Sequence, residues 1–250
     1  MKVSIITVCF NSEKTIERTI NSVLSQNYSN IEYIIVDGDS NDSTIQIIEK
    51  YKNSIQKFVS EKDDGIYDAI NKGISISTGD IVGILNSDDI FSNQSIISDI
   101  AKVFIEKPQL DSIIGNIAFI NDKEKIVRIY NSKSWRPNRL QYGFMPPHPS
   151  FYCKRELFHK FGWYKKDYKI AADYELLIRF LKIHQISYYQ LNTIMVYMNL
   201  GGVSTNGFKS IFLLNREVKR ACEENGLNTN YLKLYSKYFL KILEFIRIHK

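Results

Sequence analysis

The sequence predicts an α/β fold in which a Rossmann-like, mostly parallel β-sheet is flanked by helices and followed by a helical appendage. Two observations lead to this prediction. In the first 90 residues, short apolar runs rich in β-branched residues alternate with segments of helical periodicity. These runs are apolar throughout, which is typical of a parallel sheet that helices cover on both faces. Ligands of such sheets bind beyond the carboxyl ends of the strands.

Strands and helices alternate regularly in this first part. The predicted strands are residues 3–8, 31–36, 56–60 and 81–85. The predicted helices between them are residues 13–26, 43–52 and 66–77. In the first helix Ile16, Ile20, Val23 and Leu24 recur at helical spacing, which predicts that they share one face. Ser12 is the predicted N-cap of this helix.

The remainder of the chain is less regular. It contains a predicted helix ended by Pro108, a hairpin, an amphipathic helix, a strand-like segment and a helical C-terminus. These are residues 93–106, 112–120 with 125–130, 172–184, 186–198 and the last 40 residues. Because no repeat or linker is visible, we predict a main domain over residues 1–205 and a helical appendage over 206–250.

The composition is that of an ordinary globular chain with a basic surface. Hydrophobic residues make up 44%, charged residues 24%, and the net charge of +6 favours anionic partners. Cys9, Cys153 and Cys222 form no Cys-x-x-Cys pair, so neither a disulfide framework nor a zinc site is predicted. The N-terminal apolar run is too short for a signal peptide, and no stretch reaches the roughly 20 apolar residues of a spanning helix. We therefore expect a cytoplasmic protein, or one attached to a membrane from that side.

Carboxylates follow three successive strands at one edge of the predicted sheet. They are Asp37 and Asp39, then Asp63 and Asp64, then Asp88 and Asp89. Oxygen ligands select a hard ion such as Mg²⁺ or Mn²⁺, which shares its shell with substrate phosphates. The alternative is that these acids serve turns and helix caps. No glycine-rich phosphate loop follows the first strand, which argues against a dinucleotide dehydrogenase and a Walker-type site.

Seven stretches, taken in order, carry a resemblance to a known family. They are residues 3–11 (VSIITVCFN), 22–26 (SVLSQ), 34–44 (IIVDGDSNDST), 64–73 (DGIYDAINKG), 78–89 (TGDIVGILNSDD), 148–151 (HPSF) and 171–176 (AADYEL). Together they resemble glycosyltransferase family 2, and in particular its branch that builds bacterial surface polysaccharides such as O-antigen or capsule.

The resemblance implies a GT-A fold, an inverting transfer from a nucleotide-diphosphate sugar, here a UDP-sugar, and Mn²⁺ or Mg²⁺ as cofactor. Asp88 and Asp89 occupy the metal-binding motif, whose first position is here Asn86. Which of the two aspartates binds the metal directly stays open. The residues implied in binding the nucleotide sugar are Thr7, Phe10, Asn11, Asp37, Asp39, Asp64, Asp68, Asn71, Lys72, Asn86, Ser87 and His148.

Asp173 matches the position of the family's catalytic base. It stands at the start of the helix predicted over 172–184, where a carboxylate is stabilised as the anion. The alternative is an ordinary charge at a helix start. His148 also has two interpretations, contact with the donor phosphates or the acceptor, or a hydrogen bond within its own loop.

The family resemblance points to an acceptor hydroxyl on a glycan or a polyprenyl-diphosphate-linked sugar, and to no nucleic-acid partner. The C-terminal segment has an apolar face and a basic face, which is typical of a helix in an anionic membrane interface. The apolar face is Leu232, Tyr235, Phe239, Leu243 and Ile246, and the basic face is Lys233, Lys237 and Lys241. Packing on the main domain explains the apolar face equally well. The expected location is the cytoplasm, free or peripheral on the inner face of the plasma membrane.

Two other functions stay open at this point. A sugar-1-phosphate nucleotidyltransferase also pairs a Rossmann-like sheet with an acid-bound metal, but it would carry a glycine-rich loop with Arg and Lys after the first strand. A non-catalytic carbohydrate-binding relative would have lost the acids, and here they are present.

Overall fold

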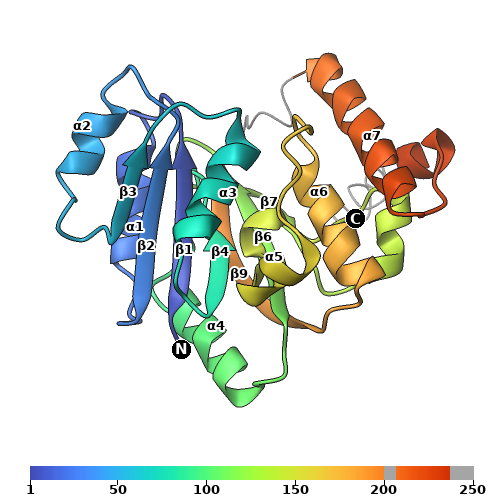
Figure 1. The fold of residues 1–250 in the computed structure, drawn as a ribbon, viewed down its shortest axis with the longest axis horizontal. Helices are drawn as coiled ribbons and strands as arrows, with labels where there is room; N and C mark the ends of the chain where they lie inside the picture. The colour runs from blue at the N-terminus through green and yellow to red at the C-terminus, as the bar shows by residue number, and fades with distance from the viewer. Residues whose placement is uncertain (200–206, 237–250) are drawn as a thin grey trace. The chain divides into compact units, whose positions relative to one another are not determined.

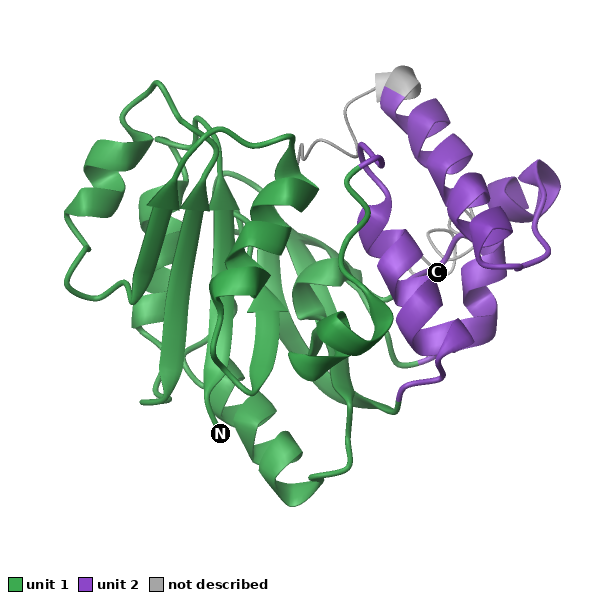
Figure 2. Cartoon of the chain, in the orientation of Figure 1, with its two compact units in different colours: residues 1–133, 146–166, 187–200 green, residues 134–145, 167–186, 201–250 purple. Residues whose placement is uncertain are grey.

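The computed structural model describes residues 1–199 and 207–236, which form parts of two compact units (Figure 2). Unit 1 comprises residues 1–133, 146–166 and 187–200, and unit 2 comprises residues 134–145, 167–186 and 201–250. Most of the predicted membrane-binding helix lies outside the described residues. The domain boundary expected after residue 205 stays a prediction.

Unit 1 is built on one mixed sheet of nine strands in the order β3-β2-β1-β4-β8-β6-β9-β5, with β7 paired to β6 (Figure 1). The strands are β1 (Val3–Cys9), β2 (Ile31–Asp37), β3 (Lys57–Ser60), β4 (Ile81–Ile84), β5 (Ile90–Phe91), β6 (Ser112–Ile120), β7 (Ile126–Tyr130), β8 (Tyr152–Lys154) and β9 (Tyr188–Asn199). The predicted α/β class is confirmed, and all seven predicted strands are present to within two residues at each end.

The four strands β3, β2, β1 and β4 pair in parallel, as their apolar sequences predict. The short antiparallel strand β8 then joins β4 to β6, because it pairs Tyr152 with both Gly83 and Ile113. Beyond it, β6 and β9 run parallel. Sequence periodicity did not predict β5 and β8, because two or three residues are too few to show an alternating pattern.

The helices and helical turns have the following bounds. In unit 1 they are α1 (Ile16–Leu24), α2 (Thr44–Glu49), α3 (Ile66–Ile76), α4 (Ile96–Glu106), the 3₁₀ turn η2 (His148–Ser150) and α5 (Glu156–Phe161). In unit 2 they are the 3₁₀ turn η1 (Pro137–Tyr142), α6 (Ala172–Leu177), the π-helical turn η3 (Ile178–Ile183) and α7 (Gly207–Glu224). Residues 231–236 are also helical.

Helices cover both faces of the sheet in unit 1. On one face α3 lies directly against β1, because a Cβ atom at Gly73 would come within 2.4 Å of Ile6 Cγ2. On the other face α1 and α4 bury their apolar sides against alternate residues of β1 and β2, among them Ile5 and Ile35. Isoleucine and valine supply much of this core, and full burial of each such side chain contributes roughly 1.5–3 kcal/mol.

Two predictions about helix ends are wrong. Ser12 is not a side-chain cap: its carbonyl accepts the N–H groups of Thr15 and Ile16 at 3.0 Å, while its hydroxyl turns toward Ser87. The helix predicted over 172–184 changes at residue 178 into a π-helical turn, in which the His184 N–H donates to the carbonyl five residues earlier. An apolar pattern over one or two turns does not distinguish these two helical periods.

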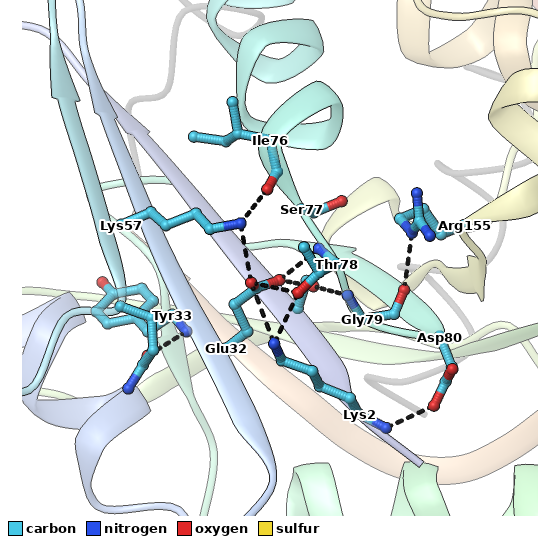
Figure 3. A network of polar contacts seen from close by, with 12 residues as sticks. Lys2, Glu32, Tyr33, Lys57, Ile76, Ser77, Thr78, Gly79, Asp80 and Arg155 are labelled. Atoms are coloured by element: carbon cyan, nitrogen blue, oxygen red, sulfur yellow. Dashed lines mark hydrogen bonds and ion pairs between the residues drawn. The ribbon is translucent and has the colours of Figure 1, made fainter.

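At the amino end of the parallel strands, Glu32 is a buried carboxylate that is fully surrounded by donors (Figure 3). Its Oε2 accepts from Ser4 Oγ at 2.6 Å and from the Thr78 N–H at 2.7 Å. Its Oε1 accepts from Thr78 Oγ1 at 2.7 Å and lies 3.3 Å from Lys2 Nζ and 3.2 Å from Lys57 Nζ. Glu32 therefore ties β1, β2, β3 and the start of β4 together.

Unit 2 has its own buried polar contacts. The Glu217 carboxylate on α7 accepts the backbone N–H groups of Lys169, Ile170 and Ala171 at 2.8–2.9 Å, directly before α6. The buried Tyr174 hydroxyl donates to the carbonyl of Leu140 in η1. These bonds join α7, η1 and the start of α6 within unit 2. No helix among the described residues is both long and apolar enough to cross a membrane.

Candidate active site

The loops that follow β1 and β2 hold one another at the carboxyl edge of the sheet. The Asn11 N–H donates to Ser40 Oγ at 2.8 Å, and the Asn41 N–H donates back to Asn11 Oδ1 at 3.0 Å. Asn11 and Asp39 both have positive φ angles, +49° and +68°, which Asn and Asp tolerate better than most residues. The structure thus joins the predicted residue Asn11 to Ser40 and Asn41, which follow the predicted residue Asp39 in the chain.

Asp37 is the internal anchor of this network. Its carboxylate is fully buried and accepts the Ser40 N–H at 3.0 Å, Ser60 Oγ at 2.7 Å and also Ser40 Oγ. Its two oxygens are therefore already used by the protein, whereas the side chain of Asp39, two residues later, is exposed. Sequence reasoning missed Ser40, although a serine three residues after an aspartate is a recognisable turn signal.

The nucleotide-binding residues predicted in β1 and directly after it also include both a buried and exposed side chains. Thr7 is fully buried, and its hydroxyl accepts the Tyr33 hydroxyl at 3.2 Å. Phe10 is 59% exposed at the start of the loop, beside the exposed Asn11. Of the residues predicted on the β1 and β2 loops, Phe10, Asn11 and Asp39 can therefore reach a ligand without rearrangement.

The loop after β4 contains the predicted metal ligands and is held at three points. The Ser12 and Ser87 hydroxyls lie 2.9 Å apart and link this loop to the loop after β1. Asn199 Nδ2 donates to the carbonyl of Asp88 at 2.8 Å, and Thr19 Oγ1 donates to the carbonyl of Asp89 at 2.8 Å. These bonds fix the main chain and leave the two carboxylate groups for other partners.

The Asp89 carboxylate is buried but incompletely satisfied. Oδ2 accepts from Asn86 Nδ2 at 3.1 Å, while the buried Oδ1 has no hydrogen-bond partner in the part of the chain that the structure describes. Burial first, and then the charge of Asp88, raise the pKa of the Asp89 carboxyl well above its ordinary value of 3.8. Burial also raises the pKa of Asp88. Two adjacent carboxyls with this character are stabilised by a cation.

These residues fit the requirements of a small hard cation. Within residues 1–199 and 207–236, no group of three or more His, Cys, Asp or Glu side chains is arranged to hold a metal ion. An all-protein cage is therefore absent from this part of the chain. One or two carboxylates are nevertheless the usual protein contribution to a Mg²⁺ site that completes its shell with substrate phosphates and water. The unmatched oxygen of Asp89 suits that kind of site.

The predicted residues that follow β3 form an ion-pair cluster. Lys166 Nζ lies 3.0 Å from Asp68 Oδ1 and 3.6 Å from Asp64 Oδ2, and Lys72 Nζ lies 3.6 Å from Asp68 Oδ2. Burial alone would raise the pKa of Asp68, but the hydrogen bond from Lys166 and the nearby lysine charges lower it. Sequence reasoning missed Lys166, because no local pattern marks a lysine nearly 100 residues away from its partner.

His148 and Asn71 meet through a third residue, Tyr164. His148 Nε2 lies 2.7 Å from the Tyr164 hydroxyl, and the two rings are edge to face. Asn71 holds the main chain of Tyr164 from both sides, donating to its carbonyl at 2.8 Å and accepting its N–H at 3.1 Å. Burial lowers the pKa of His148 to about 4, so its imidazole is neutral near pH 7. His148 therefore supplies hydrogen bonds there, not a positive charge.

Asp173 belongs to unit 2, whereas every other predicted site residue belongs to unit 1. It is the second residue of α6, is half-buried, and accepts the N–H of Tyr174 at 2.7 Å through Oδ1. The neighbouring Glu175 is fully buried and pairs with Arg179 at 2.8 Å. Of these two acids, Asp173 is thus the one with an accessible carboxylate. Its role as a base stays a prediction.

Comparison with known proteins gives a family and several relatives. The profile described as Glycosyl transferase family 2 matches residues 4–166. An uncharacterised glycosyltransferase of Mycobacterium tuberculosis is 30% identical over 182 residues, which are 71% of this chain and 68% of that protein. The UDP-Glc:α-D-GlcNAc-diphosphoundecaprenol β-1,3-glucosyltransferase of Escherichia coli is 27% identical over 217 residues, 84% of this chain and 82% of that protein.

Solved structures show the same fold. Residues 1–349 of S. aureus TarS, in complex with UDP-GlcNAc, superpose with a TM-score of 0.69 and 22% identity. The match covers 88% of this chain and 66% of that chain, so this chain spans slightly less than two thirds of its length. A mannosyltransferase of Pyrobaculum calidifontis, in complex with GDP-Man and Mn²⁺, superposes with a TM-score of 0.62 and 20% identity over 88% of this chain and 64% of that chain.

Proposed function

Because the chain belongs to glycosyltransferase family 2, we propose that it transfers a sugar from a UDP-sugar to a hydroxyl of a glycan or of a polyprenyl-diphosphate-linked acceptor. The product would be a bacterial surface polysaccharide such as O-antigen or capsule, formed with inversion at the anomeric carbon. The E. coli relative supports the donor and acceptor classes, because its name specifies UDP-Glc and a diphosphoundecaprenol-linked sugar. TarS supports the donor class, because it was solved with UDP-GlcNAc.

The observation that carries this proposal is the incompletely satisfied carboxylate of Asp89 beside Asp88, on a loop tied to the nucleotide-binding edge through Ser12 and Ser87. Exposed groups for the nucleoside stand on the neighbouring loops, at Phe10, Asn11 and Asp39. This is the arrangement expected for a ligand with a planar base at one end and a diphosphate at the other.

Asp88 and Asp89 would hold Mn²⁺ or Mg²⁺, and such an ion, when bound, neutralises the charge that develops on a leaving diphosphate. Asp173 would accept the proton of the acceptor hydroxyl as that hydroxyl attacks the anomeric carbon. His148, neutral at pH 7 and held by Tyr164, would orient a substrate oxygen by hydrogen bonding. A single displacement of this kind inverts the configuration and needs no covalent intermediate on the protein.

The test is to incubate the purified full chain with individual UDP-sugars and a polyprenyl-diphosphate-linked sugar and to identify the products. We expect UDP release that requires the acceptor for full rate, is supported by Mn²⁺ or Mg²⁺ and stops reversibly in EDTA. Release of inorganic diphosphate from UTP and a sugar phosphate would instead identify a nucleotidyltransferase. Sugar binding without turnover of any UDP-sugar would identify a non-catalytic relative. Full activity in EDTA would contradict the role given to Asp88 and Asp89.

We also propose that the protein works as a peripheral protein on the inner face of the plasma membrane, because a polyprenyl-linked acceptor lies there. Leu232 is 84% exposed at the start of the basic C-terminal segment, whereas Leu234 is fully buried. Leu232→Glu should therefore leave the fold intact and weaken flotation with anionic vesicles, whereas a cut before residue 234 would also remove core. If the Leu232→Glu variant and the unmodified chain float equally with anionic vesicles at low salt, Leu232 is not part of a membrane-binding face.

A further inference from the structure

Unit 1 contains an open pocket of about 170 Å³ that none of the predicted site residues lines. It lies on β6, on β9 and on the segment that follows β7. Its lining residues are Asn116, Ser132, Lys133, Gln190, Leu191 and Asn192. This volume is below the roughly 300–1,000 Å³ of pockets that hold drug-sized molecules, so any ligand of this pocket is smaller than those.

The pocket exists because the pairing of β6 with β9 is interrupted. Ile114 pairs with Gln190, but two residues further along β6, Asn116 pairs with Ile194, four residues further along β9. Residues 191–193 therefore leave the ladder, and Leu191 and Asn192 form one wall of the pocket. Bulges of this kind redirect side chains and are over-represented next to active sites. Gly115 permits the arrangement, because a Cβ there would lie 2.1 Å from Met195 Sδ.

A buried amide on the pocket lining has an unused donor. Asn116 is 5% exposed, and its Oδ1 accepts the Ser132 N–H at 2.8 Å and the Ser132 hydroxyl at 3.1 Å. Because a backbone N–H can only donate, the oxygen must face Ser132 and the orientation of the amide is fixed. Its Nδ2 has no acceptor among the described residues, and it is not one of the buried atoms that lack a partner, so it remains accessible to solvent. A ligand hydroxyl in the pocket can accept a hydrogen bond from it in place of water.

The remaining walls indicate the chemistry of that partner. Gln190 Nε2 donates to the carbonyl of Ser132 at 2.8 Å, which joins β9 to the segment after β7. Lys133 and Asn192 are exposed, and Leu191 adds one aliphatic side chain. The buried lining is neutral and consists of the amide of Asn116 and the hydroxyl of Ser132. Such a lining suits a ligand that presents hydroxyl groups beside C–H groups, and it lacks the buried cation expected for a phosphate.

We propose that this pocket binds one sugar residue through its hydroxyl groups, with Asn116 Nδ2 donating to a hydroxyl oxygen, and that it does so independently of the nucleotide. The further assignment of this sugar to the acceptor rests on the proposed function. The binding itself does not, because it requires neither turnover nor a metal ion.

The experiment uses the ¹⁵N-labelled full chain and follows the side-chain amide of Asn116 together with the backbone amides of Ser132 and Asn192. The probes are the methyl pyranosides of glucose, galactose, mannose and N-acetylglucosamine, with glycerol at equal concentration as the control. We expect saturable shifts of all three signals with at least one pyranoside, no such response to glycerol, and an unchanged dissociation constant when UDP is present.

Two variants separate binding from folding. Asn116→Asp keeps an oxygen for Ser132 to donate to and removes the unused donor, and Asn192→Ala removes only an exposed side chain. Each should raise the dissociation constant of the pyranoside at least about tenfold, whereas Asn53→Ala, an exposed asparagine elsewhere in unit 1, should not change it.

Three results would overturn the proposal. The first is the absence of a saturable shift with all four pyranosides. The second is an affinity that both variants retain. The third is displacement of the pyranoside by UDP, which would assign the pocket to the donor. A protein that binds the pyranoside but fails to transfer sugar would contradict the proposed function and leave this site intact.

Discussion

Two buried carboxylates on the same sheet, Glu32 and Asp89, have opposite surroundings. Glu32 lies at the amino end of the parallel strands and receives hydrogen bonds or ion pairs from Ser4, Thr78, Lys2 and Lys57 (Figure 3). Asp89 lies in the loop beyond the carboxyl end of β4, with one oxygen on an asparagine amide and the other without a partner among the described residues.

The pKa values follow this difference. Burial alone would raise the pKa of Glu32, but the hydrogen bonds from Ser4, Thr78 and Lys57 lower it below its ordinary 4.5. Burial and the charge of Asp88 raise the pKa of Asp89. The fold thus stabilises one carboxylate as the anion and leaves the other dependent on a partner from outside. We interpret the first as structural and the second as functional.

The largest expected loss of sugar transfer comes from changing a third carboxylate, Asp173, which we interpret as functional, like Asp89. Asp173→Asn keeps the shape of the side chain and removes its basicity. Transfer should fall about 10²–10⁴-fold, the usual contribution of a positioned base, while UDP binding by calorimetry and the melting temperature stay unchanged. Transfer within a fewfold of wild type would exclude Asp173. The buried, ion-paired Glu175 would be a poor replacement.

Neutralising the predicted metal ligands should lower activity and change stability in a characteristic direction. Asp88→Asn and Asp89→Asn should each reduce transfer about 10²-fold or more, because charge stabilisation of the leaving group is lost. In EDTA, Asp89→Asn should melt above wild type, because a buried carboxylate with an unmatched oxygen has been removed. Glu32→Gln is the matched control and should retain kcat at temperatures where it is folded. A loss of kcat in Glu32→Gln would contradict the interpretation that Glu32 is structural and Asp89 functional.

Glu32→Gln should instead reduce stability. Removing one partner of a buried ion pair costs about 3–5 kcal/mol, and we expect the lower end, about 3 kcal/mol, because the two lysines are partly exposed. In a chain of this size that loss corresponds to a melting temperature lower by roughly 6–12 °C. The control is Glu106→Gln, whose exposed pair with Lys102 should contribute less than about 1 kcal/mol. Equal melting temperatures for the two variants would contradict the anchoring role of Glu32.

The smallest effect is the pH dependence of stability in EDTA. Because the folded-state pKa of Glu32 is lowered, its contribution is complete above pH 4.5 and is lost as the pH falls through the folded-state pKa. The raised pKa of Asp89 has the opposite sign: the folded state binds that proton more tightly, so stability increases as the pH falls through this raised pKa. The pKa of His148, which burial lowers from 6.5 to about 4, makes stability fall on acidification in the same window in both proteins. The test is therefore the difference between the two urea-unfolding curves from pH 8 to pH 4: the stability of wild type relative to Asp89→Asn should rise on acidification, and a constant difference would contradict the raised pKa of Asp89.

Much of the fold and part of the site could be predicted from the sequence. Runs of mostly apolar residues located β1, β2 and β4, because burial on both faces of a sheet favours apolar side chains at nearly every position. The fourth parallel strand, β3, has a weaker pattern because it is only partly buried. The same topology explains why the loops with Asn11, Asp39 and Asp89 meet at one edge, since parallel strands end together. The family profile over residues 4–166 confirmed the resemblance carried by these motifs.

The rest depends on contacts that no local pattern records. Asp37 was predicted to bind a nucleoside, but its oxygens are used by Ser40 and Ser60, and the second of these comes from a different strand. Lys166 reaches the acids after β3 from a distant part of the chain. The interruption of β9 opposite Gly115 was also hidden, because the sequence predicts one continuous strand over residues 186–198. Side-chain partners of this kind are set by packing after the strands have paired.

The order of strands in the sheet has a consequence for synthesis of the protein on the ribosome. Among the described strands β8 lies between β4 and β6, and the other long edge of β6 pairs with β9. When residues 1–133 have emerged, β7 can already pair with Ile117–Ile120 of β6, but the outer edge of β4 and the edge of β6 that later pairs with β9 still present unpaired backbone groups. Open edges of this kind associate readily with other chains. The nascent protein therefore needs shielding until Tyr152–Lys154 and then Tyr188–Asn199 have been translated, and truncated products that end before them are expected to aggregate.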